Sequence, residues 1–280
     1  MILLLLLLGL ASATRCVNFY GLETERRDLV CSWVNPPRYY LTELKNELNV
    51  TRIRVPVSYE YAIADNFTNL DGLFDVCMDL NITVILDMHR IWDTHQSAIP
   101  EDGIPRDEFL RVWEILLDRY NSFDVLIGVG LFNEIQHDDP IYTQGLYDQM
   151  IPYIDSRYGD DRFHYYLGCH TWASNCTGLN LDVYGDKAFL EIHAYPFSHV
   201  QQWDEVLPSN ISGSQIFVGE VGFKSTEVNW AAQFFGFLNR RAIDNVCFWT
   251  ISNSGDTGGL WEDDCINKST IKWELIKYFL

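Results

Sequence analysis

The chain has 280 residues, 48% of them hydrophobic, which fits one large domain with a sizeable core better than two small ones. Its formal net charge is −19, from 39 acidic and 20 basic residues. This balance argues against a nucleic-acid partner, which needs basic patches, and disfavours anionic polysaccharides and anionic membranes, whereas a neutral substrate is compatible with it.

The N-terminus has the composition of a secretory signal peptide. Residues 1–14 carry no charged side chain, and residues 2–8 are an isoleucine followed by leucines. The small residues Ala11 and Ala13 predict cleavage after Ala13, so that 1–13 is the signal peptide and 14–280 one mature domain. The apolar run is too short to span a bilayer and no later segment is longer, so we expect a secreted protein without stable membrane insertion.

Sequons and cysteines favour the same compartment. The sequence has six Asn-x-Ser/Thr sequons, of which we expect one or two to be unoccupied, and seven cysteines, most of which should pair outside the cell. The short-loop pairings are the ones we predict, although sequence alone does not fix the connectivity. The sequons are Asn49, Asn66, Asn81, Asn175, Asn210 and Asn267; the predicted pairs are Cys16 with Cys31, Cys169 with Cys176 and Cys247 with Cys265, with Cys77 as a buried free thiol.

Short apolar strands alternate with amphipathic helices through the mature chain. Eight strands with intervening helices predict an α/β fold, a single (β/α)8 TIM barrel. The expected strands are residues 17–20, 51–56, 83–89, 125–132, 163–168, 189–195, 215–219 and 246–250. The expected helices are residues 39–48, 70–80, 107–120, 142–156, 229–243 and 270–279, with a short turn at 203–207 and no clear helix after the fifth strand.

Polar side chains gather at the C-terminal ends of these strands, where barrel enzymes keep their chemistry. The run VLIGVGLFNEIQ ends its apolar part in Asn133 and Glu134, and the run QIFVGE ends in Glu220. A single glutamate at a strand end is usually an ion-pair or capping residue, but all these groups fall on one rim. Two carboxyls on one rim are the minimum needed to cleave a glycosidic bond. The others are Arg54, Asp87, His89, Glu191, His193, Tyr195 and Trp249.

Other interpretations of these residues are weaker. Asp87, His89 and His95 could be imagined as metal ligands, but no further carboxylates support them, so we expect no metal and no cofactor. His89 and His193 could be hydrogen-bonded core residues, which is the commoner fate of a histidine. His193 and the residue two positions later, Tyr195, share one face of their strand and can both point over the barrel mouth.

Seven segments of the chain resemble glycoside hydrolase family 5, the cellulase-type retaining glycosidases, and more narrowly its secreted endo-β-1,4-glucanases. The resemblance covers nearly all of the mature chain, and the run SGDTGGLWEDD after the eighth strand is its most specific part. It implies an active site formed by Arg54, His89, Asn133, Glu134, His193, Tyr195, Glu220 and Trp249. The segments are VNFYGLET (17–24), TRIRVPVS (51–58), VILDMHR (84–90), LFNEIQHDDP (131–140), EIHAYP (191–196), VGEVG (218–222) and FWTISNSGDTGGLWEDD (248–264).

The resemblance also implies a role for each of these residues. Glu134 would be the general acid/base and Glu220 the nucleophile, held ionised by Arg54. Tyr195 would hydrogen-bond Glu220, and His193 would orient Glu134 or Tyr195. Asn133 would bind the 2-hydroxyl of the sugar, and His89 other hydroxyls of the same ring. Trp249 is the expected floor of the sugar site, and Trp33 and Trp172 are expected to extend the cleft. Trp203 and Trp261 are expected to pack in the core or to anchor the surface instead.

The expected function is therefore endo-acting, retaining hydrolysis of a neutral β-1,4-glucan by a monomeric secreted protein. Shorter loops around the fifth and sixth strands leave the polymer open, so β-mannanase or another β-glucanase remains an alternative. An alternative of another class is a catalytically silent glycan-binding surface protein. Loss of Glu134, Glu220 or Asn133 would have indicated that class, and all three residues are present.

Overall fold

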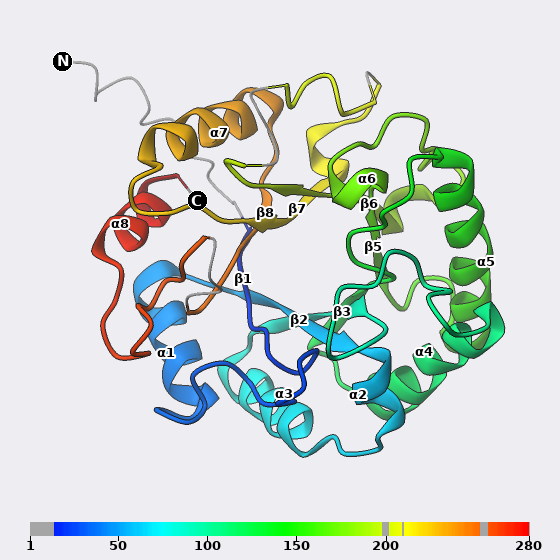
Figure 1. The fold of residues 1–280 in the computed structure, drawn as a ribbon, viewed down its shortest axis with the longest axis horizontal. Helices are drawn as coiled ribbons and strands as arrows, with labels where there is room; N and C mark the ends of the chain where they lie inside the picture. Colours follow the sequence, from blue (N-terminus) through cyan, green and yellow to red (C-terminus); the bar gives the residue numbers. More distant parts are fainter. Residues whose placement is uncertain (1–13, 198–201, 209, 253–256, 280) are drawn as a thin grey trace.

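Eight parallel strands close into a barrel in chain order, with the helices packed around its outside (Figure 1). The computed structural model describes residues 14–197, 202–208, 210–252 and 257–279. The predicted single (β/α)8 barrel is confirmed. The predicted signal peptide, residues 1–13, lies outside the described residues, and the first strand begins directly after it.

The eight strands are close to their predicted positions, with two informative differences. The first strand begins at Thr14, three residues earlier than predicted, and the fourth ends at Gly130, before the predicted end at residue 132. Leu131 and Phe132 are fully buried in the loop that follows. An apolar run in the sequence therefore does not show where a strand ends and a buried loop begins. The strands are β1 Thr14–Asn18, β2 Arg52–Ser58, β3 Thr83–Arg90, β4 Leu126–Gly130, β5 His164–Gly168, β6 Ala188–Ala194, β7 Ile216–Val221 and β8 Asn245–Phe248.

The six predicted helices are all present. Within α4 the predicted apolar stripe of Trp113, Leu116, Leu117 and Tyr120 is buried, as expected for an outer helix that packs on a barrel. After β6 the chain forms the predicted turn at 203–207, and the link after β5 holds a four-residue helix and a short 3-10 turn. The helices are α1 Pro37–Leu48, α2 Tyr59–Ile63, α3 Thr68–Leu80, α4 Arg106–Tyr120, α5 Pro140–Tyr158, α6 His170–Ala173, α7 Val228–Arg241 and α8 Thr270–Phe279, with 3-10 turns η1 Gly185–Lys187 and η2 Gly213–Gln215.

Disulfides follow the closure of the barrel rather than the order of the chain. Two of the three predicted pairings are wrong, because the bonds are Cys16–Cys247 and Cys31–Cys265. Cys16 on β1 lies directly opposite Cys247 on β8, since closing the barrel places its first and last strands side by side. The predicted Cys169–Cys176 bond is confirmed, and Cys77 is buried and free as expected.

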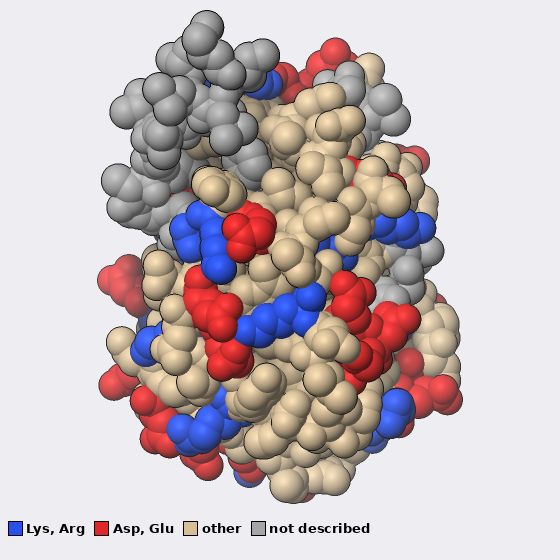
Figure 2. All heavy atoms as spheres, turned by 90° about the vertical axis from the view of Figure 1, so that its left-hand side faces the viewer, with Lys and Arg blue, Asp and Glu red and all other residues tan. Residues whose placement is uncertain are grey.

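The surface carries mixed charge. On the face around α1 and α8, lysines and arginines are interspersed with acidic side chains rather than gathered in one patch (Figure 2). Lys268 illustrates this arrangement, because its ammonium contacts both Glu43 and Glu47. Among the described residues, no helix has the length and apolar character needed to cross a membrane.

Candidate active site

A cavity of about 680 Å³ opens where the strands end, and most of the predicted site residues line it. Arg54 and Asn133 do not line it but lie buried beneath it. Trp33 is also absent from its lining; the indole is 53% exposed in the loop after β1, under the guanidinium of Arg26. The lining residues are His89, Arg90, Glu134, Thr171, Trp172, Ser174, His193, Tyr195, Phe197, Glu220, Trp249 and Thr257.

Glu220 lies in β7 with its carboxylate almost fully buried. Its Oε1 accepts a hydrogen bond of 3.0 Å from Nη1 of Arg54, and its Oε2 accepts one from the Tyr195 hydroxyl. A bulge sets this position, because Ile192 on β6 pairs with Val218 whereas the next residue, His193, pairs with Glu220. Two donors, one of them a cation, therefore stabilise the charged form of this carboxylate.

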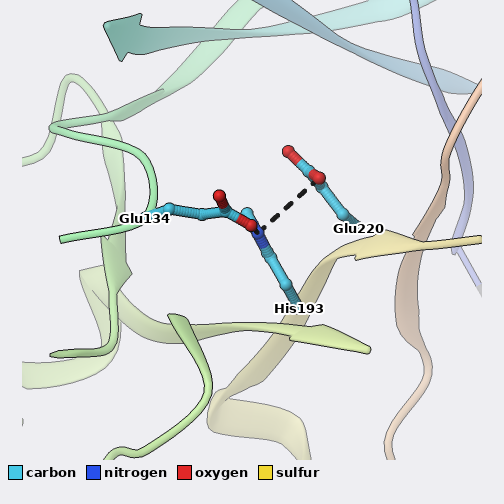
Figure 3. Close-up of side chains that lie close together, drawn as sticks. All are labelled: Glu134, His193 and Glu220. Atoms are coloured by element: carbon cyan, nitrogen blue, oxygen red, sulfur yellow. Dashed lines mark hydrogen bonds and ion pairs between the residues drawn. The ribbon is translucent and has the colours of Figure 1, made fainter. Parts of the chain in front are cut away.

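Glu134 lies in the loop after β4 and is the more exposed of the two carboxylates, with 22% of its side chain accessible. The backbone N–H of Asn133, just before it, donates to Met88 of β3, which holds this loop against the barrel. An oxygen of Glu134, an oxygen of Glu220 and a ring nitrogen of His193 all lie within 4.8 Å of one another (Figure 3). Two acidic groups from different strands thus face one point in the cavity.

His193 stands between these carboxylates. Its Nδ1 lies 2.9 Å from Oε1 of Glu134 and 3.6 Å from Oε2 of Glu220, and its Nε2 lies 3.3 Å from Oε1 of Glu191. Burial acts to lower the pKa of His193, but the charges of Glu220, Glu134 and Glu191 raise it to about 10. The ring is therefore an imidazolium at neutral pH and offers a metal no lone pair, although this trio is the one converging set of ligand atoms among the described residues.

Arg54 organises the floor of the cavity. Its side chain is fully buried, and it donates from Nη1 to Asn18 as well as Glu220, and from Nη2 to Asn133 at 2.7 Å. The same Nη2 lies 2.9 Å from carboxylate oxygens of both Asp87 and Glu191. Burial opposes the charge, but three carboxylates outweigh it and raise the pKa of Arg54 above its usual range.

His89 is held by the same floor. Its Nδ1 lies 2.8 Å from Oδ2 of Asp87, and its Nε2 lies 3.5 Å from Nδ2 of Asn133. Burial lowers the pKa of His89 well below its usual value, so its ring is neutral. The two histidines of the cavity thus differ in protonation state. Three carboxylates raise the pKa of His193, whereas burial has the largest effect on the pKa of His89 and lowers it.

Comparison with known proteins identifies the family to which the chain belongs. The sequence model of the cellulases of glycosyl hydrolase family 5 matches residues 10–255. The chain belongs to glycosyl hydrolase family 5. It is similar to an endoglucanase of Paenibacillus polymyxa, with 24% identity over 91% of this chain and 80% of that protein.

Solved structures share the fold of this family 5 enzyme. The catalytic domain of the major endoglucanase from Xanthomonas campestris pv. campestris superposes with a TM-score of 0.81 at 18% identity, covering 96% of this chain and 94% of that one. An endocellulase from Pyrococcus horikoshii, in a Y299F–cellotetraose complex, gives the same TM-score at 17% identity, covering 96% and 92%. At identities this low, the superpositions support the barrel fold, and the substrate has to be inferred from the site itself.

Aromatic rings form two groups around the cavity of the family 5 enzyme. Trp249 is half-buried, with the rings of Tyr20 and His89 each stacked against it at 5.6 Å. Trp172 and Phe197 instead stand out from the rim, 50% and 66% exposed, and Phe197 stacks on Tyr195 at 5.2 Å. The first group is fixed by its neighbours, whereas the second faces solvent.

Trp172 owes its position to an unusual loop. Thr171, Trp172 and Ala173 all have positive φ values, a conformation that costs energy for residues other than glycine. The Cys169–Cys176 disulfide closes this loop, and the Trp172 N–H donates to Ile135 in the loop that carries Glu134. Trp172 is therefore fixed on the Glu134 side of the cavity.

Several residues of the site were not assigned from sequence. Asp87 and Glu191 were noted at strand ends but given no role, although their spacing of two from His89 and His193 places each pair on one strand face. Asn18 and Phe197 had no distinct signal. Trp203 and Trp261, expected to pack in the core or to anchor the surface, are both buried. The residues that sequence reasoning missed are Asn18, Tyr20, Asp87, Arg90, Thr171, Ser174, Glu191, Phe197 and Thr257.

Proposed function

We propose that this enzyme is a retaining endo-β-1,4-glucanase, with Glu134 as general acid/base and Glu220 as nucleophile. The observation that carries the proposal is the approach of the two carboxylates, which have oxygens within 4.8 Å of each other. Retaining glycosidases hold their carboxyls about 5–5.5 Å apart, and inverting ones about 6.5–9.5 Å apart to admit a water. The separation in this enzyme therefore supports the retaining arrangement.

In the first step Glu220 attacks the anomeric carbon, and the bond to the leaving sugar breaks as Glu134 donates its proton to the glycosidic oxygen. The donors Arg54 and Tyr195 keep Glu220 charged and aimed until it reacts. Asn133, buried beneath the cavity beside Arg54, would bind the 2-hydroxyl as charge develops on the ring.

In the second step Glu134, now a carboxylate, removes a proton from water, which attacks the same carbon and releases Glu220. The N–H of the His193 imidazolium faces Glu134 at 2.9 Å and stabilises its charged form. Glu134 is also the more exposed carboxylate, as a group that receives water should be.

The substrate assignment rests on the cavity and on the relatives. Trp249 gives the reacting sugar an apolar platform, and Trp172 and Phe197 offer exposed rings beyond it. The similar proteins are named endoglucanases or endocellulases, and the one from Pyrococcus horikoshii was solved with cellotetraose. A neutral β-1,4-glucan also suits a protein of net charge −19.

We also propose that the enzyme is a secreted, N-glycosylated monomer with residues 14–280 as its catalytic domain. Five of the six sequon asparagines are exposed, and Asn175 is half-buried; the three disulfides favour an oxidising compartment. The test is the intact mass of secreted material before and after deglycosylation, with its size in solution. Seven alkylatable thiols and no glycan would contradict secretion through this route.

The substrate is tested by reducing-sugar release from carboxymethyl-cellulose, mannan, xylan and mixed-linkage glucan. We expect release from the first and the last. Preference for mannan would favour β-mannanase, and binding without release from any polymer would favour a silent glycan-binding protein.

The two carboxylates are tested separately with Glu134→Gln, Glu220→Gln and an activated aryl cellobioside. This substrate needs little acid help, so Glu134→Gln should still form a glycosyl-enzyme on Glu220, and azide should speed its breakdown. Glu220→Gln should form no intermediate and lose at least about 1,000-fold in kcat, as expected when a catalytic nucleophile is removed. A trapped sugar on Glu134, or inverted products, would overturn the assignment.

A further inference from the structure

Glu191 of β6 carries a buried carboxylate that the mechanism above does not use. Its residue is 1% exposed, and Oε1 lies 2.9 Å from Nη2 of Arg54 and 3.3 Å from Nε2 of His193. Its Oε2 has no hydrogen-bond partner among the described residues. A single carboxylate oxygen thus contacts both cations beneath Glu134 and Glu220, and Glu191 does not line the cavity.

The backbone makes room for this carboxylate. Gly219 is the extra residue of the β7 bulge, immediately before Glu220. A Cβ at position 219 would lie 1.8 Å from Oε1 of Glu191, so no side chain fits there. The bulge that places Glu220 beside His193 therefore also leaves the space that the Glu191 carboxylate occupies.

The two contacts of Glu191 lead to different catalytic groups. Through Arg54, which donates to Glu220 at 3.0 Å, it reaches the nucleophile. Through His193, whose Nδ1 lies 2.9 Å from Glu134, it reaches the acid/base. A carboxyl group faces each nitrogen of the ring, and the Glu191 carboxylate faces Nε2, so Glu191 favours an N–H at that nitrogen.

We propose that Glu191 is a positioning residue that holds His193 as a charged donor toward Glu134 and steadies Arg54 beneath Glu220. This inference rests on the roles proposed for Glu134 and Glu220. It assigns Glu191 no contact with substrate and no transfer of a proton.

The charges around His193 fix the sign of the expected effect. Glu134, Glu191 and Glu220 face the ring from the loop after β4, from β6 and from β7, and all three act to raise its pKa, to about 10. The cation Arg54, from β2, contacts the same Glu191 oxygen as His193 and so opposes the charge of the ring, whereas His89 of β3 is neutral. Asp87 of β3 also interacts electrostatically with His193, and Tyr195 stays uncharged because its pKa is raised well above its usual value. His193 therefore stays charged when one carboxylate is neutralised, so loss of the Glu191 charge makes the potential at Glu134 more positive.

The test is Glu191→Gln, whose amide keeps the shape and leaves one oxygen able to accept from both cations. We expect the nitrogen resonances of His193 to titrate at least about one pH unit lower than in the wild type, the scale of one lost charge contact. The basic limb of kcat/KM on an unactivated cello-oligosaccharide, whose leaving group needs the acid, should move down by about one unit as well. Asp87→Asn is the matched control, since it removes a carboxylate that contacts Arg54 at the same 2.9 Å without contacting His193, and it should shift His193 less.

An unchanged His193 titration and an unmoved basic limb in Glu191→Gln would overturn the proposal and leave Glu191 a structural residue. If that variant does not fold, the wild type decides, because a His193 ring with a single N–H at pH 7 would also overturn it. The resonance readout does not require hydrolysis, so failure of the proposed function would appear separately, in the Glu134 and Glu220 variants.

Discussion

The cavity has two regions that are built in opposite ways. Below the catalytic carboxylates, Arg54, Asp87 and Glu191 are at most 1% exposed, and each contacts a second charged group. At the rim, Trp172 and Phe197 are at least half exposed. Each side chain of the floor contacts another buried charged group, so substituting one of them leaves that group without its partner. A rim ring, in contrast, can be substituted with little effect on the residues around it. With the proposed function, the floor would govern the reaction, and the rim would govern the length and kind of glycan that binds.

Arg54→Met should have the largest effect, because it removes the cation that three buried carboxylates share. Breaking a buried ion pair costs about 3–5 kcal/mol of unfolding free energy, since the partner charges remain buried. Denaturant unfolding measures this loss, and activity should fall with it. Arg38→Met is the matched control, as Arg38 pairs with Asp79 on the surface, where such pairs are worth about 0–1 kcal/mol. Equal losses in the two variants would show that the buried position of Arg54 gives its ion pairs no special role in stability.

Gly219→Ala should have the next largest effect, by crowding Glu191 rather than removing a charge. The new methyl would lie 1.8 Å from Oε1 of Glu191, and overpacking of this kind typically costs about 1–3 kcal/mol. Gly145→Ala in α5 is the control, since its Cβ would meet nothing within 4 Å and should be neutral or stabilising.

Combining Gly219→Ala with Glu191→Ala should recover part of the loss, because the second change removes the atoms that clash. A double-mutant cycle measures this coupling. Strictly additive losses would show that Gly219 matters for the bulge itself and not for the seat of Glu191.

The sequence predicted the side chains that the strand order brings together better than it predicted the rim, and the reason is geometric. In a parallel barrel every strand end lies on one rim, so the positions of His89, Glu134 and Glu220 in the strand order were enough to bring them together. Barrel geometry also explains the two wrong disulfide predictions. Chain order favoured short loops, whereas barrel closure joined Cys16 to Cys247 across 231 residues.

Rim residues depend on loop conformation, which apolar periodicity does not encode. Trp172 reaches the cavity through three successive positive φ values and a disulfide, and Phe197 reaches it by stacking on Tyr195. The sequence predicted that Trp33 would extend the cleft as Trp172 does, but Trp33 lies outside the cavity lining. Buried carboxylates such as Glu191 were visible at their strand ends, but only the contact with His193 gives Glu191 a role.

Trp172→Ala should have the smallest effect and the most selective one. Trp172 lies on the Glu134 side of the cavity, where the leaving part of the glycan would lie, and an aromatic contact is worth about 0.5–1.5 kcal/mol. We therefore expect kcat/KM to fall about three- to tenfold on cello-oligosaccharides that extend past the cleaved bond. An aryl cellobioside, which has no sugar on that side, should be hydrolysed as well as by the wild type, and stability should change little.

Trp33→Ala is the matched comparison for this last change, since the two indoles are almost equally exposed and only Trp172 lines the cavity. We expect Trp33→Ala to leave both substrates unaffected. A loss on the long substrates in Trp33→Ala would extend the cleft to the loop after β1. A loss on the aryl cellobioside in Trp172→Ala would mean that this ring supports the reacting centre, and that the rim is not independent of the floor.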